Sequence, residues 1–488
     1  MSARPASTPN PASPAPRGRN ESLGTEKIGK LLARLSIPAM IGMFVNALYN
    51  LVDTIFIGQA VGPAGIGGLA ISFPFQILLF AISTMIGIGG ASVCSRALGA
   101  GDMVKARRAA GNAFAMSAVL ALAILAGGLF FLEEILIAFG ATPGLIDHAR
   151  DYLEIIVIGS PLLIVAVTGN ILIRSEGRAK VAMVTMLIGA GANLILDPIF
   201  IFGLGMGVRG AAWATVIGFG LSFVFVLGFF LSGRSSLSFS RADLRIAPAI
   251  SREMLAVGFP NFMKQVGGSL LVIVANNVLR VHGGDIAIAT FGVINRILMF
   301  AVMPVFGIVQ GFQPIAGYNY GARNMERVRE VVKVASIATT ACASLFFVAM
   351  MAFPGPLMSI FGDDAELIAL GTQAMRIIVL VLPIIGVQLV GATFFMAIGR
   401  AFPALVLSVS RQILFLIPLV IVFPLFWGTT GVWLAFPVAD TLATSVTIVW
   451  VASELRKLRL HDRSFDRPRD EKTGSPAQPA VTAETSAS

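Results

Sequence analysis

The chain has 488 residues, of which 56% are hydrophobic and only 13% are charged. A soluble domain carries about 25% charged residues, so this composition excludes an ordinary soluble protein and indicates a membrane protein with several spans. The net charge of +10 does not indicate nucleic-acid binding, because the basic residues stand between apolar segments. Cys94 and Cys342 lie in apolar segments without metal-ligand spacing, so no disulfide framework is expected.

Both ends of the chain are polar. Residues 1–30 begin with a stretch rich in Pro, Ala, Ser and Gly, and residues 456–488 are polar and poor in aromatic residues. Both are predicted to be disordered cytoplasmic tails. The first tail lacks the apolar core of a cleavable signal peptide, so the first apolar segment is expected to remain as a membrane anchor.

Long apolar runs separated by glycine, proline and charged residues predict about twelve membrane-spanning helices, at about twenty residues for each crossing. The expected spans are 37–58, 67–92, 110–132, 152–173, 182–203, 211–231, 254–277, 288–311, 334–353, 377–398, 404–424 and 431–452. The fold class is therefore an all-α membrane protein.

The charges between the spans predict the orientation. Basic residues follow the second, fourth, sixth and eighth spans and the last one: Arg96, Lys105, Arg107, Arg108, Arg174, Arg178, Lys180, Arg234, Arg241, Arg245, Arg252, Arg323, Arg327, Arg329, Lys333, Arg456, Lys457 and Arg459. The other connections are short or acidic. By the positive-inside rule, both termini are cytoplasmic in a multi-pass protein of a prokaryotic inner membrane.

The two halves of the chain repeat each other. A shift of 222 positions superposes these pairs: Pro38 and Pro260, Gly62 and Gly284, Gly89 and Gly311, Gly99 and Gly321, Lys105 and Arg327, Pro161 and Pro383, Gly177 and Gly399. Six spans are an even number, so both halves enter the membrane in the same sense, which predicts a pseudo-two-fold axis along the membrane normal. The expected units are two six-helix bundles, 31–233 and 253–455, joined by a cytoplasmic linker, 234–252.

The first span carries a carboxylate inside an apolar segment. Asn46, Tyr49 and Asn50 stand seven, four and three residues before Asp53, so their side chains share one helical face. An acid in hydrocarbon costs about 2.5–3.5 kcal/mol on insertion scales, so it normally faces a protein interior or a wet cavity. The stripe favours a proton or cation site, although a hydrogen bond to a neighbouring helix is the simpler alternative.

The fifth span carries a second acid, Asp197, one helical turn after Asn193 and directly before Pro198. Proline cannot donate to the carbonyl of Leu194, so an acid, an amide and a free carbonyl could together hold H⁺, Na⁺ or a cationic substrate. An Asp-Pro that simply ends a helix is the structural alternative. The 222-residue shift places Ala275 and Leu419 opposite the two acids, so this chemistry belongs to the first half.

Asp440, Lys264 and Arg296 are charged residues that also lie within predicted spans, in the second half. Asp440 could make a packing contact or bind a cation, and the sequence leaves both alternatives open. Lys264 could extend toward the cytoplasmic surface, whereas Arg296 stands nearer mid-span and is expected to pair or to line a cavity. A cationic substrate is not expected beside Arg296.

Several of these segments resemble the multidrug and toxic compound extrusion (MATE) transporters, over roughly residues 30–455. The similar motifs are LYNLVDTIFIG at 48–58, SRALGAGD at 95–102, NLILDPIF at 193–200, GVRGAAWAT at 207–215 and YNYGA at 318–322. The resemblance implies two six-helix bundles around a cavity that opens alternately to each side. It also implies export of amphipathic, cationic compounds in exchange for H⁺ or Na⁺.

The resemblance further assigns site residues. Acids matching Asp53 and Asp197 couple the ion, Asn193 and Thr215 match their polar partners by spacing, and Asn170 and Tyr152 are looser matches. The family's other pattern places a Glu in span seven and an Asp in span ten. Here span seven carries Lys264 and span ten has no acid, which favours coupling in the first half.

Other classes of function are less consistent with the sequence. A flippase for lipids or lipid-linked saccharides of the same superfamily is the main alternative, and Arg296 keeps it open. The chain has no Walker loop, HExxH or GxSxG motif, so neither an enzyme nor a cofactor is expected. A channel is less consistent with a duplicated unit that buries acids. The expected partners are drugs or metabolites, H⁺ or Na⁺ and the bilayer, and the expected state is a monomer.

Overall fold

The computed structural model describes residues 21–465, and its regular structure is helical throughout that range. The first half contains α1 (Ser22–Thr25), α2 (Ile28–Ala60), α3 (Pro63–Gly99), α4 (Met103–Phe130), α5 (Leu132–Ala138), α6 (Ile146–Ser175), α7 (Ala179–Pro198), the π-helix η1 (Ile199–Gly203) and α8 (Gly207–Leu231). The 3₁₀-helix η2 (Arg241–Leu244) lies in the connection to the second half.

The second half has the same order of helices. It contains α9 (Pro248–Gly321), α10 (Met325–Ala352), α11 (Pro354–Ser359), α12 (Ala365–Ile378), the 3₁₀-helix η3 (Val379–Val381), α13 (Leu382–Ala397), α14 (Ala401–Val409), the π-helix η4 (Ser410–Leu416), α15 (Ile417–Val422) and α16 (Pro424–Phe465).

Eleven helices in the described range are long and apolar enough to cross a membrane. One of them, α9, contains Gly284 with a φ of 63°, where the helical path is interrupted. Splitting α9 at this glycine yields the seventh and eighth predicted spans, so the prediction of about twelve spans is confirmed. Most of the helices extend beyond the predicted apolar cores at their polar ends.

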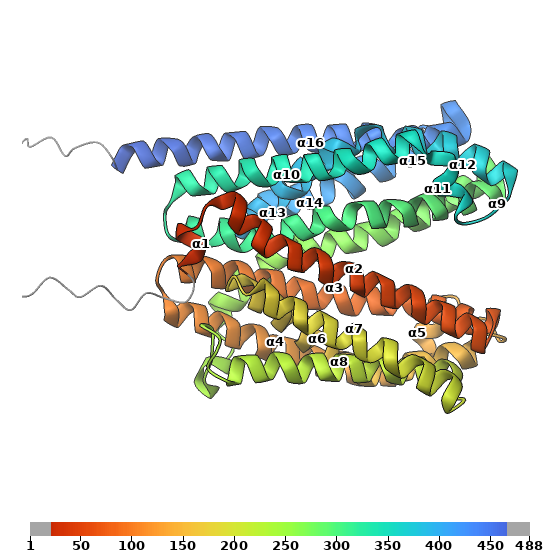
Figure 1. Ribbon diagram of the computed structural model, residues 1–488, viewed down its shortest axis with the longest axis horizontal. Helices are drawn as coiled ribbons and strands as arrows, with labels where there is room; N and C mark the ends of the chain where they lie inside the picture. Colours follow the sequence, from red (N-terminus) through yellow and green to blue (C-terminus); the bar gives the residue numbers. More distant parts are fainter. Residues whose placement is uncertain (1–20, 466–488) are drawn as a thin grey trace, which may run out of the picture.

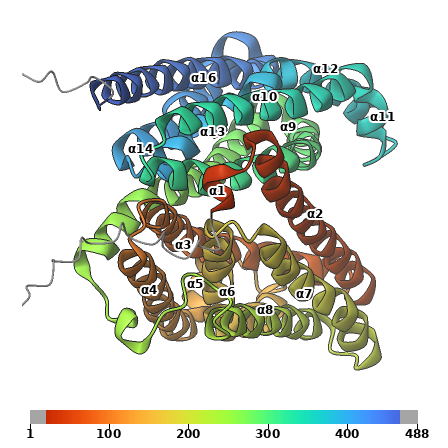
Figure 2. The same ribbon diagram turned by 60° about the vertical axis from the view of Figure 1, so that its left-hand side comes forward.

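The helices form two groups that lie side by side (Figures 1 and 2). We call α2–α8 the first lobe and α9–α16 the second lobe. One apolar core lies entirely within each lobe, and two others contain residues of both lobes. The start of α2 packs against the second lobe through Leu31, Leu32 and Leu35. The later part of α2 contributes Ile57 to a core of the first lobe, so α2 crosses the junction between the lobes.

The repeat is visible in the backbone. Gly62 and Gly284 have almost the same unusual conformation, with φ and ψ of 78° and −161° and of 63° and −161°. Asp102 and Asn324 each cap the next helix, by accepting hydrogen bonds from Lys105 N at 2.9 Å and Arg327 N at 3.1 Å. The predicted relation between the halves is thereby confirmed, whereas the domain boundaries at 233 and 253 stay a prediction.

The lobes contact each other closely near the end that carries the described ends of the chain. A Cβ atom on Gly99 would overlap the carbonyl oxygen of Tyr318, and one on Gly321 would overlap that of Arg96. These two contacts are related by the 222-residue shift. Glu253 adds an ion pair with Arg96 at 2.9 Å across the same junction. Small residues therefore let the helix backbones touch here.

The predicted tails are shorter than expected at their inner ends. Within 1–30, α1 buries Leu23 completely, and Asn319 Nδ2 donates to the Leu23 carbonyl at 2.9 Å. At the other end, α16 continues to Phe465 rather than stopping near 455. The remainder of both tails, 1–20 and 466–488, lies outside the described residues.

Candidate functional site

Asp53 lies on the inner face of α2. Large apolar side chains follow one another on the opposite face at helical spacing and are exposed: Ile37, Ile41, Phe44, Leu48, Leu51 and Ile55. Asp53 is only 6% exposed, and its Oδ1 atom has no hydrogen-bond partner among the described residues. The first acid therefore faces the protein interior and can accept a further hydrogen bond or a cation.

Asp197 is fully buried at the end of α7. Pro198 follows it, and the backbone then changes to the π-helix η1, in which Leu204 N donates to Ile199 O at 2.9 Å. Proline removes one donor of the helical ladder, and π-helical turns often mark functional positions. The Asp-Pro pair therefore does not end the span, because the helical path continues to Gly203.

Asn193 links the second acid to α8. When both polar ends of its amide are satisfied, the nitrogen donates to Asp197 Oδ2 at 3.0 Å, and the oxygen accepts from Thr215 N at 3.2 Å and Thr215 Oγ1 at 3.1 Å. Asn193 and Thr215 are themselves buried. The structure therefore brings together Asn193, Asp197 and Thr215, which the family resemblance assigns to one site, while their role in ion coupling stays a prediction.

Two tyrosines lie beside the acids. The buried Tyr152 hydroxyl interacts with Thr215 and accepts a hydrogen bond from Gln76 Nε2 at 3.4 Å. Tyr49 and Tyr152 both lie within electrostatic range of Asp53, which in turn interacts with Asp197. The first-lobe site therefore consists of these residues: Tyr49, Asp53, Gln76, Tyr152, Asn193, Asp197 and Thr215.

Gln76 was missing from the sequence prediction. Gln76 is a large polar residue within the long uncharged segment of the second span. A polar side chain in such a segment is the feature of the sequence that could have indicated a site residue. Its partner, Tyr152, lies on another helix, so the pairing itself could not be read from spacing.

The other three asparagines predicted beside the acids, Asn46, Asn50 and Asn170, lie in different places. Asn50 is exposed, and its Nδ2 atom donates to the backbone carbonyl of the partly buried Asn46 at 2.8 Å. Asn170 is buried, but its amide donates to Ala182 O at 2.7 Å near the opposite end of α7. Fifteen helical residues separate Ala182 from Asp197, which corresponds to about 22 Å. The structure therefore places Asn170 in a helix contact away from the acids.

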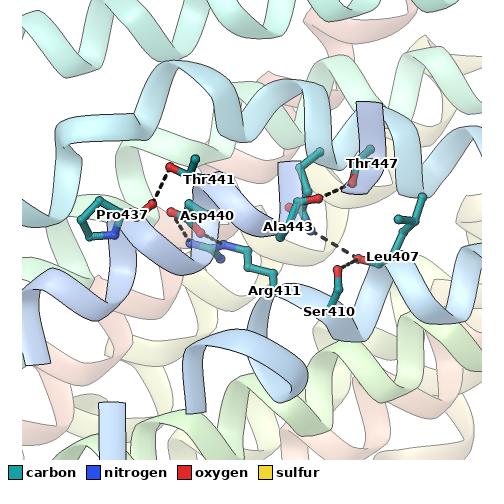
Figure 3. A network of polar contacts seen from close by, with 9 residues as sticks. Leu407, Ser410, Arg411, Pro437, Asp440, Thr441, Ala443 and Thr447 are labelled. Carbon is teal, nitrogen blue, oxygen red and sulfur yellow. Dashed lines mark hydrogen bonds and ion pairs between the residues drawn. The ribbon is translucent and has the colours of Figure 1, made fainter. Parts of the chain in front are cut away.

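The second lobe has a different polar interior. Asp440 is 2% exposed and forms an ion pair with Arg411 of η4, so the structure favours the packing alternative over a free cation site. The sequence analysis did not predict Arg411 as the partner of this acid (Figure 3). Arg296 is exposed, and no hydrogen bond or ion pair joins it to another described residue. Of the two alternatives expected for it, a pairing is not seen among the described residues, and the lining of a cavity stays a prediction.

The chemistry of the first-lobe site follows from its groups. The carboxylates of Asp53 and Asp197 lie close enough to repel each other, and no basic residue among 21–465 forms an ion pair with either. The hydroxyl and amide groups around them can orient a cation. Within 21–465, no cluster of three or more His, Cys, Asp or Glu side chains could hold a metal ion. The arrangement fits a proton or a weakly held monovalent cation better than a tightly bound divalent metal.

The chain is similar to known transport proteins over most of its length. The sequence profile of the MatE family matches residues 38–199 and 256–422. The multidrug export protein MepA of Staphylococcus haemolyticus is 26% identical over 438 residues, which cover 90% of this chain and 96% of that protein. MepA of Staphylococcus saprophyticus is 25% identical over 422 residues, covering 86% and 93% of the two chains.

Solved structures show the same likeness. A MATE protein crystallised in complex with MaL6 superposes with a TM-score of 0.86 at 26% identity, covering 91% of this chain and 99% of that one. A transporter of the MOP superfamily from Pyrococcus furiosus, described as having a binding pocket of reverse polarity, has a TM-score of 0.86 at 26% identity and covers 91% and 100%.

Proposed function

The chain belongs to the MatE family, and on this premise we propose that it exports amphipathic cations from a prokaryotic cell in exchange for H⁺. Na⁺ is the alternative coupling ion, bound at Asp53 and Asp197. The observation that carries the proposal is the burial of these two acids in one lobe with no basic partner beside them. The names of the MepA relatives support multidrug export as the activity.

The site can couple two movements because its charge is variable. When both acids are ionised, their repulsion and burial favour the uptake of a cation, either a proton or a positively charged substrate. A proton and a positively charged substrate compete for such a site. This competition couples the entry of the proton to the exit of the substrate. Asn193, held by Thr215, positions the Asp197 carboxylate for this exchange.

Alternating access needs two arrangements of the lobes. We propose that the junction around Gly99 and Gly321 is the closed cytoplasmic gate, with both termini in the cytoplasm. Opening of this gate would admit substrate, and its closure would commit the substrate to release on the other side. Each lobe has its own core, so the working unit is expected to be a monomer of two bundles.

Reconstituted vesicles test the proposal. A fluorescent amphipathic cation is loaded, and its movement is followed under an imposed proton gradient and then under an imposed sodium gradient. We expect saturable exchange driven by the proton gradient. Movement that depends on neither gradient, or that does not saturate, would contradict coupled export.

A further inference from the structure

A cavity lies between the two lobes, at the end of the molecule that carries the described ends of the chain. Its volume is about 940 Å³, and Gly321 of the glycine contacts forms part of its wall. We call it the junction pocket. Its basic residues come from both lobes: Arg96 and Lys105 from the first, and Arg323, Arg400 and Lys457 from the second. An anion in this pocket can therefore contact both lobes at once.

The internal repeat relates the junction pocket to a second position, which α1 occupies. The 222-residue shift superposes Arg96 on Tyr318 and Lys105 on Arg327. Tyr318 and Arg327 both contact α1, which lies between the two groups of helices in Figure 1. One of the two related positions is thus filled by a segment of the chain.

The filled position shows what such a pocket binds. Leu23 of α1 is completely buried there, and Gly24 packs against the Tyr318 ring. The guanidinium of Arg327 donates through Nη2 to the Glu26 carbonyl at 2.7 Å and to the Leu23 carbonyl at 3.5 Å. The basic residue of the filled position is therefore satisfied by oxygen acceptors beside an apolar side chain.

The segment that corresponds to α1 does not enter the junction pocket. The shift places residues 244–247 opposite α1, and this segment packs against α4 instead. Asn112 of α4 donates through Nδ2 to the Arg245 carbonyl at 3.1 Å and accepts from Ala247 N at 2.6 Å. Oxygen acceptors from this part of the chain are therefore not supplied to the junction pocket.

The ion pairs of the junction pocket leave positive charge over. Arg96 and Lys105 share the single carboxylate of Glu253, at 2.9 and 3.3 Å. Arg400 has a partner of its own, Glu454, at 3.4 Å. Two basic side chains on one carboxylate therefore leave one positive charge without a counter-ion.

Arg323 and Lys457 add two exposed cations. No ion pair or side-chain hydrogen bond joins either of them to another described residue, and Asp102 is occupied as the cap that accepts from Lys105 N. With Glu253 counted, five basic side chains face three acidic ones, so the pocket has an excess of two positive charges. Like charges gathered in a cavity repel each other and attract anions.

An aromatic surface lies next to the pocket. Phe402 follows Arg400 by two residues and is 70% exposed, and its ring lies 6.4 Å from that of Trp450. Trp450 stands one helical turn before Glu454 on α16. Exposed aromatic residues beside basic ones are typical of the level of the lipid headgroups. Basic pockets between membrane helices bind the phosphates of such headgroups.

We propose that the junction pocket binds the phosphate group of an anionic phospholipid, whose acyl chains lie along Phe402 and Trp450. The headgroup supplies the oxygen acceptors that α1 supplies at the related position, and it joins the two lobes at their closed junction. The site goes beyond the proposed export function, and its occupancy does not depend on which compounds are exported.

Native mass spectrometry of the purified protein in a neutral detergent tests the site. The protein is titrated with phosphatidylglycerol, with phosphatidylcholine of the same acyl chains, or with inorganic phosphate alone. We expect phosphatidylglycerol to bind about tenfold more tightly than phosphatidylcholine, because only the former carries a net negative charge. Inorganic phosphate should bind weakly, because it lacks the acyl chains.

A double substitution in the pocket locates the binding. Arg323→Asn with Lys457→Gln removes two cationic contacts and should weaken binding of the first phosphatidylglycerol about tenfold or more. Asparagine tolerates the positive φ of 57° at position 323, and both side chains are exposed, so the thermal unfolding of the lipid-free protein should not change. The matched control, Lys180→Gln with Lys333→Gln, removes two exposed lysines outside the pocket and should bind as the unaltered protein does.

Three results would overturn the site: equal affinity for the two lipids, unchanged binding in the pocket variant, or an equal loss in the control variant. If inorganic phosphate abolishes the preference for phosphatidylglycerol and its own binding is lost in the pocket variant, the pocket takes soluble phosphate and the lipid assignment is wrong. Binding is measured here without transport. A failure of the lipid site therefore leaves the export function standing, and a failure of export in vesicles leaves the lipid site standing.

Discussion

Asn193 stands one helical turn before Asp197 on α7, and its amide nitrogen lies 3.0 Å from the Asp197 carboxylate. This contact depends on Thr215 of α8, which holds the other end of the same amide. The position of the second acid is therefore set by a neighbouring helix, and movement of α8 against α7 would change it.

The first prediction concerns this link. Thr215→Val keeps the shape of the side chain but removes the hydroxyl, so the Asn193 amide loses one of its partners. A lost hydrogen bond of this kind costs about 1 kcal/mol, and we expect proton-driven export to fall about fivefold. Thr215→Ser keeps the hydroxyl and should retain most of the rate. Export rates normalised to the amount of inserted protein provide the measurement, and equal rates for the two variants would contradict the role of Thr215.

Much of the fold was predictable from the sequence. The membrane spans follow from the length of the apolar segments, and the repeat follows from the positions of Gly, Pro and Arg between them. Both can be recognised without knowing which residues are in contact. The helix ends were less predictable, since a helix such as α10 begins at Met325 among polar residues, well before its apolar segment. Polar residues at the membrane surface continue a helix without contributing to the hydropathy signal.

The site was predictable only in part. Asn193 and Asp197 share a helix, so their spacing predicts their contact. Arg411 and Asp440 are 29 residues apart in the sequence and lie on different helices. Helical spacing does not reveal which face of one helix contacts which face of another, so this ion pair could not be predicted. For the same reason, the sequence does not reveal that Asn170 contacts α7 at Ala182, far from the two acids.

The second prediction concerns the glycine contacts between the lobes. Gly99→Val adds a side chain where the Tyr318 carbonyl already lies, so the closed arrangement of this end should become unfavourable. Gly127→Val is the matched control, because a Cβ at Gly127 would meet nothing within 4 Å.

Distances between spin labels at Val104 and Glu326 provide the measurement, in protein whose two native cysteines are replaced by alanine. Both positions are exposed near the junction and are related by the repeat. We expect a longer mean distance for Gly99→Val and an unchanged one for Gly127→Val. A distance distribution in Gly99→Val identical to that of the unaltered protein would show that this contact does not hold the lobes together.

The third prediction concerns Glu176, in the connection between α6 and α7. Burial raises the pKa of this carboxyl to about 7, although hydrogen bonds from Ser235 Oγ and Ser236 N, the latter at 2.7 Å, act in the opposite direction. A raised pKa means that the folded state binds the proton more tightly than the unfolded state. This stability is therefore fully present below the ordinary pKa of a glutamate and is lost as the pH rises toward 7.

Thermal unfolding in detergent checks the sign. Each pKa unit corresponds to about 1.4 kcal/mol, so the loss for Glu176 between pH 4.5 and pH 7 is about 3 kcal/mol. We expect the unaltered protein to lose stability relative to Glu176→Gln, which cannot ionise, as the pH rises over this range. Parallel pH profiles for the two proteins would exclude Glu176 as the titrating group.

The measurement that tests the central claim most directly is proton-driven export by Asp53→Asn and Asp197→Asn in reconstituted vesicles, with the amount of inserted protein and the binding of the dye measured in parallel. The account predicts that each variant inserts normally but loses export driven by the proton gradient, because neither amide can take up and release a proton. Undiminished proton-driven export by both variants would contradict it.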